Sequence, residues 1–148
     1  MTLSDWAAQH PDEIIAEATS RAGVARLLAV VAREITDAKG VPSDDGRLEH
    51  AFAACLAIAR AALAACGYRL RSSAHHFLAI ESLQHTIGLT ESEVTQLQRF
   101  RGMRSRAMYE KVGIVTATDA QAALAAAHRL RERLTAWLGE EHPELAKE

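Results

Sequence analysis

The 148-residue chain contains few aromatic residues, prolines or cysteines, and each shortage limits its architecture. Aromatic residues make up 5% of the chain while alanine and leucine abound, which favours helices packed on helices because these two are strong helix formers. The three prolines, Pro11, Pro42 and Pro143, lie in expected loops or near the ends, so long helices are possible between them. We predict a single domain, 1–148, that buries a core without metal or disulfide bonds.

The two cysteines, Cys55 and Cys66, belong to one apolar stretch. On a single helix they would lie about 16 Å apart along the axis, which is too far for a disulfide. We interpret both as reduced core residues, as is typical of a cytoplasmic protein. Residues 1–13 include acids and no apolar run, and we find no stretch of about 18 apolar residues, so we expect neither a signal peptide nor contact with a membrane.

Motifs for metals, nucleotides and covalent catalysis are also missing from the sequence. It has no HExxH, no CxxC and no histidine pair four residues apart, so we predict no metal site. Glu81 and His85 are four apart, which we interpret as a surface hydrogen bond. Because GxGxxG, P-loop and GxSxG patterns are absent too, we predict no cofactor, and ordinary hydrolase, kinase and thiol-enzyme functions lose their usual support.

Hydrophobic spacing predicts an all-α, antiparallel up-and-down bundle of four to six helices. We expect N-terminal helices within 4–39, with a break at Pro11 and a clear helix over 21–39. Further helices are expected at 47–66, 73–87, 90–111 and 118–138, followed by a frayed polar tail over 140–148. The helix over 47–66 should be the most buried, and Gly67 should end it. Capping patterns at Thr90–Glu93 and Thr118–Gln121 predict where the last two helices begin.

A basic segment, RFRGMRSRAMYEK at 99–111, stands out in a chain whose formal net charge is −2. Its cations are Arg99, Arg101, Arg104, Arg106 and Lys111, opposed by a single acid. Such a concentration of positive charge favours binding of phosphate or of an acidic partner surface. The alternative is that these arginines are solvated, or pair with the acids of 12–17 and 91–93.

The geometry of a helix limits how these residues cooperate. Arg106 and Tyr109 share a face directly, whereas Arg104 and Tyr109 diverge by about 140° and meet only if the helix ends or unwinds there. An arginine and a phenol together can hold a phosphate, since guanidinium binds it bidentately. His75 and His76 point about 100° apart on the preceding helix, so one can face the core and the other a groove.

Three features of the chain resemble the HEPN domains of prokaryotes. They are the order of the helices, the stretch His75-His76-Phe77 with Ile80-Glu81-Ser82-Leu83, and the stretch 104–109 (RSRAMY). The resemblance covers about 47–138. It implies a helical bundle, often dimeric, whose late helix carries an Arg followed after four to six residues by His. In the ribonuclease members these two side chains meet across the dimer and cleave RNA without metal, leaving a cyclic phosphate end.

Carried over to this chain, Arg104 matches the family arginine, Ser105 replaces the usual Asn, and Tyr109 stands where His would be. A phenol with a pKa near 10 is a poor base at neutral pH, so the substitution weighs against catalysis unless His75 or His76 moves the proton. The resemblance implies a homodimer that binds RNA, a nucleotide or a nucleotidyltransferase-type partner, within a toxin–antitoxin or defence pair.

We therefore hypothesise a binding module in which Arg104, Tyr109 and His76 form the reactive group. Phosphate or a partner would contact the surrounding residues Arg99, Arg101, Arg106, Lys111 and His75. Two alternatives remain open. One is a metal-independent endoribonuclease that uses Tyr109 in place of the motif His, and the other is a purely structural helical dimer.

Overall fold

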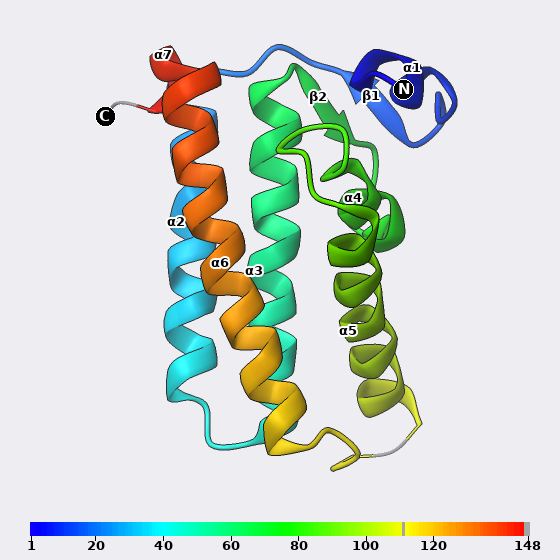
Figure 1. Ribbon diagram of the computed structural model, residues 1–148, viewed down its shortest axis with the longest axis vertical. Coiled ribbons are helices and arrows are strands. Elements are labelled where there is room, and N and C mark those ends of the chain that lie inside the picture. The colour runs from blue at the N-terminus through cyan, green and yellow to red at the C-terminus, as the bar shows by residue number, and fades with distance from the viewer. Residues whose placement is uncertain (111, 147–148) are drawn as a thin grey trace.

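The computed structural model describes residues 1–110 and 112–146, shown as a ribbon in Figure 1. Its helices are α1 (Leu3–Ala8), α2 (Arg21–Gly40), α3 (Asp44–Ala65), α4 (His76–Ser82), α5 (Glu91–Tyr109), α6 (Ala117–Glu141) and α7 (Pro143–Ala146). Two short strands, β1 (Ile14–Ala16) and β2 (Tyr68–Leu70), form a small sheet. The long helices α2, α3, α5 and α6 alternate in direction (Figure 1), so the prediction of an antiparallel, mainly helical bundle is confirmed.

Helix α3 is the centre of the bundle. It packs against α2 and α6 on one side and against α4 and α5 on the other (Figure 1). As predicted for the helix over 47–66, its apolar residues are buried: Leu48, Phe52, Cys55 and Leu63 are each at most 2% exposed. Cys66 is only half-buried, contrary to the interpretation as a core residue, because α3 ends at Ala65 and the chain leaves the core there.

By length and composition α3 could also cross a membrane, which the search for long apolar stretches in the sequence overlooked. Its polar first turn and its many alanines hide this apolarity from a simple count of large hydrophobic residues. In the structure 72% of the most apolar 18-residue window is buried inside the bundle, so the apolar surface of α3 is used for packing against the other helices.

Side-chain caps determine where the long helices begin. The capping box predicted at α5 is confirmed: the Thr90 hydroxyl accepts from the Glu93 N–H at 3.1 Å, and the Glu93 carboxylate accepts from the Thr90 N–H at 2.9 Å. The cap predicted at Thr118 is wrong, because Thr116 caps α6 by accepting from the Asp119 N–H at 3.0 Å. Helix α3 likewise begins earlier than predicted, after the cap Ser43.

The N-terminal region differs most from the expectation. Residues 12–20 form no second helix; instead β1 pairs antiparallel with β2, with Ile14 opposite Leu70. Gly67, at φ 87°, adopts the left-handed conformation that ends α3 as predicted and turns the chain back toward β1. Trp6 of α1 is 2% exposed and its indole N–H donates to Glu81 at 2.6 Å, which holds the N-terminal segment on α4.

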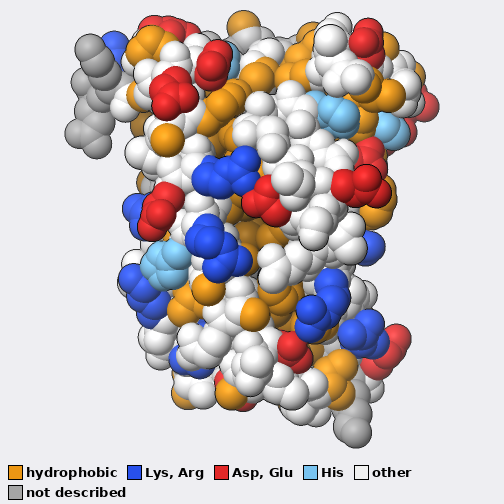
Figure 2. Space-filling model, in the orientation of Figure 1, with side chains coloured by type: hydrophobic (Ala, Val, Ile, Leu, Met, Phe, Trp, Pro, Cys, Tyr) orange, Lys and Arg blue, Asp and Glu red, His pale blue; other side chains and the backbone are white. Residues whose placement is uncertain are grey.

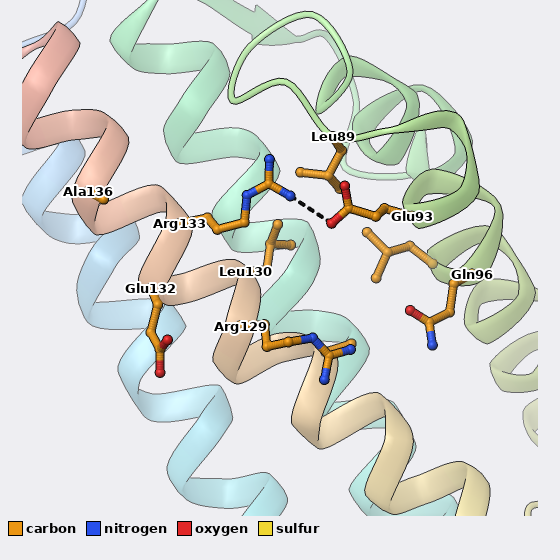
Figure 3. Close-up of a pocket in the computed structure, with 10 residues that line it drawn as sticks. Leu89, Glu93, Gln96, Arg129, Leu130, Glu132, Arg133 and Ala136 are labelled. Atoms are coloured by element: carbon orange, nitrogen blue, oxygen red, sulfur yellow. Dashed lines mark hydrogen bonds and ion pairs between the residues drawn. The ribbon is translucent and has the colours of Figure 1, made fainter.

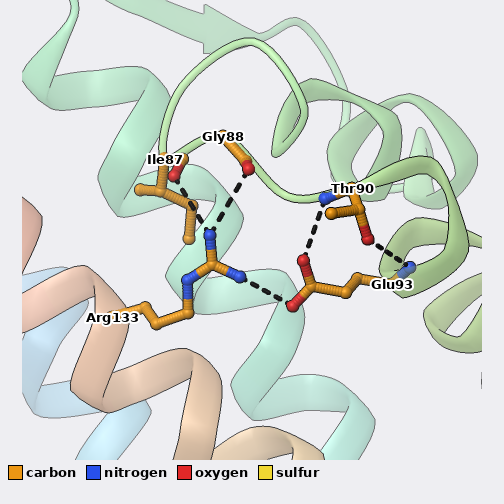
Figure 4. Close-up of polar contacts among 5 residues, drawn as sticks. All are labelled: Ile87, Gly88, Thr90, Glu93 and Arg133. Atoms are coloured by element: carbon orange, nitrogen blue, oxygen red, sulfur yellow. Dashed lines mark hydrogen bonds and ion pairs between the residues drawn. The ribbon is translucent and has the colours of Figure 1, made fainter.

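Helix α4 is shorter than the predicted helix over 73–87, and the residues after Ser82 form turns that lead to Gly88 at φ 80°. Arg133 of α6 holds this loop in place (Figure 4). Its guanidinium donates to Glu93 at 2.6 Å and approaches the carbonyl oxygens of Ile87 and Gly88 at 3.4 Å. The loop between α4 and α5 is thereby tied to α6, the last long helix of the bundle.

The region predicted as a frayed tail is ordered over most of its length. Helix α6 continues to Glu141, and Pro143 then begins the short helix α7, as a proline at the first helical position often does. Leu145 packs against the main core. Leu145 is an apolar residue within an otherwise polar stretch, and its packing explains why the chain folds back there. Lys147 and Glu148 lie outside the described residues.

Candidate functional site

The arginines of the basic segment lie on two different edges of helix α5. Arg101 and Arg104 lie about 60° apart around the axis, whereas Arg99 and Arg106 lie about 20° apart on a different edge. Arg99 pairs with Asp119 of α6 at 3.2 Å. Arg106 is exposed, and its guanidinium folds back along the helix toward Gly102. If residue 102 carried a Cβ atom, that atom would lie 3.7 Å from Nη1 of Arg106. The four arginines of the basic segment therefore do not form one surface.

Arg101 is held in one orientation by its neighbours. Its Nε donates to the side-chain oxygen of Gln98 at 2.8 Å, and the Gln98 amide donates to the Phe77 carbonyl oxygen at 3.0 Å. The guanidinium carbon also lies 5.5 Å from the centre of the Phe77 ring, in cation–π range. These contacts occupy Nε, and the two terminal nitrogens of Arg101 have no hydrogen-bond partner among the described residues.

His76, the first residue of α4, is surrounded by positive charge. Burial lowers its pKa below the ordinary value, and the charges of Arg104, Arg60 and Arg101 lower that pKa further, in this order. Its ring approaches Phe52 edge-on, with the ring centres 6.2 Å apart. We call Arg60, Arg101, Arg104 and His76 the arginine cluster. At pH 7 its histidine is neutral, so the charge comes from the three guanidinium groups.

Arg60 is the member that the sequence analysis missed. It is half-buried on α3, burial lowers its pKa, and its Nη2 donates to the Ser73 carbonyl oxygen at 3.2 Å. A signal was present in the sequence: Arg60 is the single charged residue between Ala51 and Ala65. A charge retained in the most buried helix of a bundle costs desolvation energy and is therefore a candidate for a specific role.

A cavity of about 450 Å³ adjoins Arg60 between α2, α3 and β2. Arg26 and Arg60 contribute positive charge to its wall, beside the ion pair of Arg69 with Glu17. Tyr68 contributes an aromatic ring, and Ser72 and Ser73 contribute hydroxyl groups. This cavity is large enough for a small ligand, and its walls combine cations, an aromatic ring and hydroxyls. Arg60 thus belongs both to this cavity and to the arginine cluster.

Two of the acids that were considered as internal partners for the basic segment pair with other arginines. Glu17 pairs with Arg69 at 2.9 Å, and Glu93 pairs with Arg133 at 2.6 Å. Among residues 1–110 and 112–146, no ion pair involves a side chain of the arginine cluster. The clustered charge is therefore not neutralised by carboxylates of the described part of the chain.

Tyr109 does not join Arg104. Helix α5 stays regular through Tyr109, so the two side chains leave the axis about 140° apart, and the tyrosine is 77% exposed. His75 sits at the N-cap of α4 and makes no side-chain cap there. Lys111 lies outside the described residues.

The pair Glu81 and His85, interpreted as a surface hydrogen bond, instead contacts Trp6. Glu81 accepts the indole N–H, and the His85 ring stacks on the indole with the ring centres 5.4 Å apart. A separate group, Glu34, Asp37 and His50, brings its ligand atoms within 4.8 Å of one another on the surface of α2 and α3. Exposed carboxylates commonly gather without a metal, and this group alone carries no assignment.

Comparison with protein-family models, with curated proteins and with solved structures finds no match to this chain. Its function must therefore be argued from its own residues.

Proposed function

We propose that this protein is a HEPN-like module that binds a phosphate-bearing ligand, RNA or a nucleotide, through the arginine cluster. The observation that carries the proposal is that the charges of Arg60, Arg101 and Arg104 all act on His76, while none of these arginines pairs with a carboxylate in the described part of the chain. Phosphate oxygens accept hydrogen bonds from guanidinium groups in a bidentate geometry, which makes arginine the preferred residue for such ligands.

The proposal moves the centre of the site relative to the sequence-based hypothesis. Arg104 remains in it and is also the residue that matches the family arginine, while Arg60 replaces Tyr109 as its neighbour. The cavity beside Arg60 offers room for the part of the ligand that carries the phosphate, and Tyr68 offers an aromatic surface for a base. Arg99 and Arg106 are peripheral in this proposal.

The test is binding of a short fluorescein-labelled single-stranded RNA in EDTA, measured by fluorescence anisotropy at several salt concentrations. Arg104→Ala and Arg101→Ala should each weaken binding about 10- to 100-fold, because charge-assisted hydrogen bonds are worth roughly 1.5–3 kcal/mol. Each should also make the salt dependence shallower by about 0.7 in the log–log slope, as expected for one lost phosphate contact on a single strand.

Arg106→Ala is the matched control, since it removes the same charge from an exposed position on the other edge of α5. It should change binding less than about threefold. Equal losses in the control and in Arg104→Ala would mean that only net charge matters, which contradicts a specific site. Absence of RNA and nucleotide binding by the unmodified protein would end the proposal.

One observation favours a second candidate function, a metal-independent endoribonuclease. The lowered pKa keeps His76 neutral at pH 7, so its imidazole can accept the proton of a ribose 2′-hydroxyl while the neighbouring arginines stabilise charge on the phosphate. In the same experiment, cleavage that is lost in both His76→Gln and Arg104→Ala but kept in Tyr109→Phe would establish this function. Binding without cleavage leaves the binding module.

A further inference from the structure

Helices α5 and α6 both pack on α3 but diverge from each other toward the C-terminal end of α6 (Figure 1). The divergence leaves a groove of about 500 Å³ between them. Leu89, Leu97 and Leu130 contribute apolar side chains to it, each at most 6% exposed. The space-filling view shows hydrophobic atoms at the bottom of this groove, with cationic side chains above them (Figure 2). The groove shares no residue with the arginine cluster.

The charged side chains around the groove leave one unpaired positive charge directed into it. Arg133 and Glu93 pair with each other across its upper end, and Glu132 points away from α5 (Figure 3). Arg129 instead extends from α6 toward α5, where Gln96 lies on the opposite wall (Figure 3). Within residues 1–110 and 112–146, the Arg129 side chain makes no hydrogen bond and no ion pair. A ligand in this groove would therefore meet apolar surface and one free guanidinium.

We propose that this groove binds a small monocarboxylate with an unbranched apolar chain of medium length. The apolar chain would lie on the leucines, the carboxylate would accept from Arg129, and the Gln96 amide would supply a further hydrogen bond. The volume lies within the usual range for small-ligand sites, which combine an apolar lining with a few polar groups that orient the ligand. This site goes beyond the proposed phosphate-binding function and does not depend on it.

The charge pattern selects this class over its alternatives. An uncharged apolar ligand would make no use of the Arg129 guanidinium, which is exposed and has no partner among the described residues. A dianion would gain little from a single guanidinium and would bring its second charge near Glu93. A short anion without an apolar chain would not contact the apolar lining of the groove. Affinity should therefore rise with chain length until the groove is filled, by at most roughly fourfold per methylene, the value for complete burial.

The experiment titrates the full chain with decanoate, butanoate and decanol by isothermal calorimetry, below the concentrations at which micelles form. Arg129→Gln removes the charge at an exposed position and should not affect folding. We expect decanoate binding to weaken at least tenfold in Arg129→Gln, and decanol binding to stay unchanged. Arg131→Gln, which removes an exposed charge from the same helix outside this groove, is the matched control and should bind decanoate like the unmodified protein.

A second readout locates the ligand independently of the substitution. Amide chemical shifts in ¹H–¹⁵N spectra should move on addition of decanoate in α5 near Gln96 and in α6 near Arg129. Equal binding of decanoate and decanol, unchanged binding in Arg129→Gln, or shifts confined to other helices would each overturn the proposal. Absence of decanoate binding together with self-association that Arg129→Gln abolishes would instead make the groove a dimer interface, which would also overturn it.

Discussion

The contact between Glu93 and Arg133 permits a quantitative prediction, because Glu93 has two separable roles (Figure 4). It closes the capping box of α5 through Thr90, and it accepts from Arg133 of α6 at 2.6 Å. Glutamine at this third helical position also completes a capping box. Glu93→Gln therefore removes the ion pair and keeps the cap, whereas Glu93→Ala removes both. The two variants separate the contribution of the helix cap from that of the ion pair.

The expected magnitudes follow from exposure and geometry. The side chains of Arg133 and Glu93 are 39% and 44% exposed, so the pair belongs with partly solvated ion pairs worth about 0.5–1 kcal/mol. The cap adds about 1 kcal/mol. Glu93→Gln should therefore lower the free energy of unfolding by about 0.5–1 kcal/mol and Glu93→Ala by about 1.5–2 kcal/mol. For a chain of this size the second value lowers Tm by roughly 3–8 °C.

Urea unfolding followed by circular dichroism measures these differences. The double variant Glu93→Gln with Arg133→Gln should show a coupling free energy of about 0.5–1 kcal/mol that shrinks in high salt. The hydrogen bond from the Thr90 N–H and then Arg133 lower the pKa of Glu93 in the folded state. The contribution of Glu93 to stability is therefore complete above about pH 4.5 and is lost as pH falls through the lower folded-state pKa. Equal effects of Gln and Ala at position 93, or zero coupling, would refute this account.

Two further predictions concern buried titratable groups. Burial raises the pKa of Cys55 to about 12 and also raises the pKa of half-buried Cys66. A thiol reagent such as DTNB should therefore label Cys66 slowly and Cys55 only on unfolding. Rapid labelling of two thiols in the native protein would contradict this. The pKa of His76 is lowered on folding, so its neutral form is favoured and the folded state loses stability as pH falls below about 6.5. His76→Gln should weaken that pH dependence in urea titrations between pH 7 and 5, and an unchanged dependence would mean that folding does not lower the pKa of His76.

The parts of the fold that depend on local patterns could be predicted from the sequence. The buried stripe of α3 follows from helical spacing, and the capping box at Thr90 follows from two residues three apart. The strands could not be predicted in the same way, since each has three residues and the pairing joins Ile14 to Leu70 across the chain. No periodicity is measurable over three residues, and the pairing depends on how α3 ends and where α1 docks.

The candidate site was predicted in part, and the reason is again geometric. Helical spacing already separates Arg104 from Arg106 by about 160°, but the sequence does not say which edge of α5 faces α4. That choice depends on Gln98 and Phe77, whose contact lies between two helices. Arg60 was missed because its helix was interpreted as core, and a search for basic segments passes over an isolated charge. Tyr109 was included because it belongs to the basic segment and stands at the position of the family histidine, and the regular end of α5 separates it from the cluster.

The arginine cluster is costly for the folded chain, and this cost is itself an argument for a ligand. Three guanidinium groups that act on one histidine repel one another, and Arg60 loses hydration on the most apolar helix while donating one hydrogen bond to the Ser73 carbonyl oxygen. A sequence selected for stability alone would place an apolar residue at position 60, as at most positions around it. Residues that are unfavourable for folding in this way are expected at positions where function requires them. A phosphate bound between these arginines would offset both the repulsion and the lost hydration, whereas no carboxylate of the described residues pairs with them.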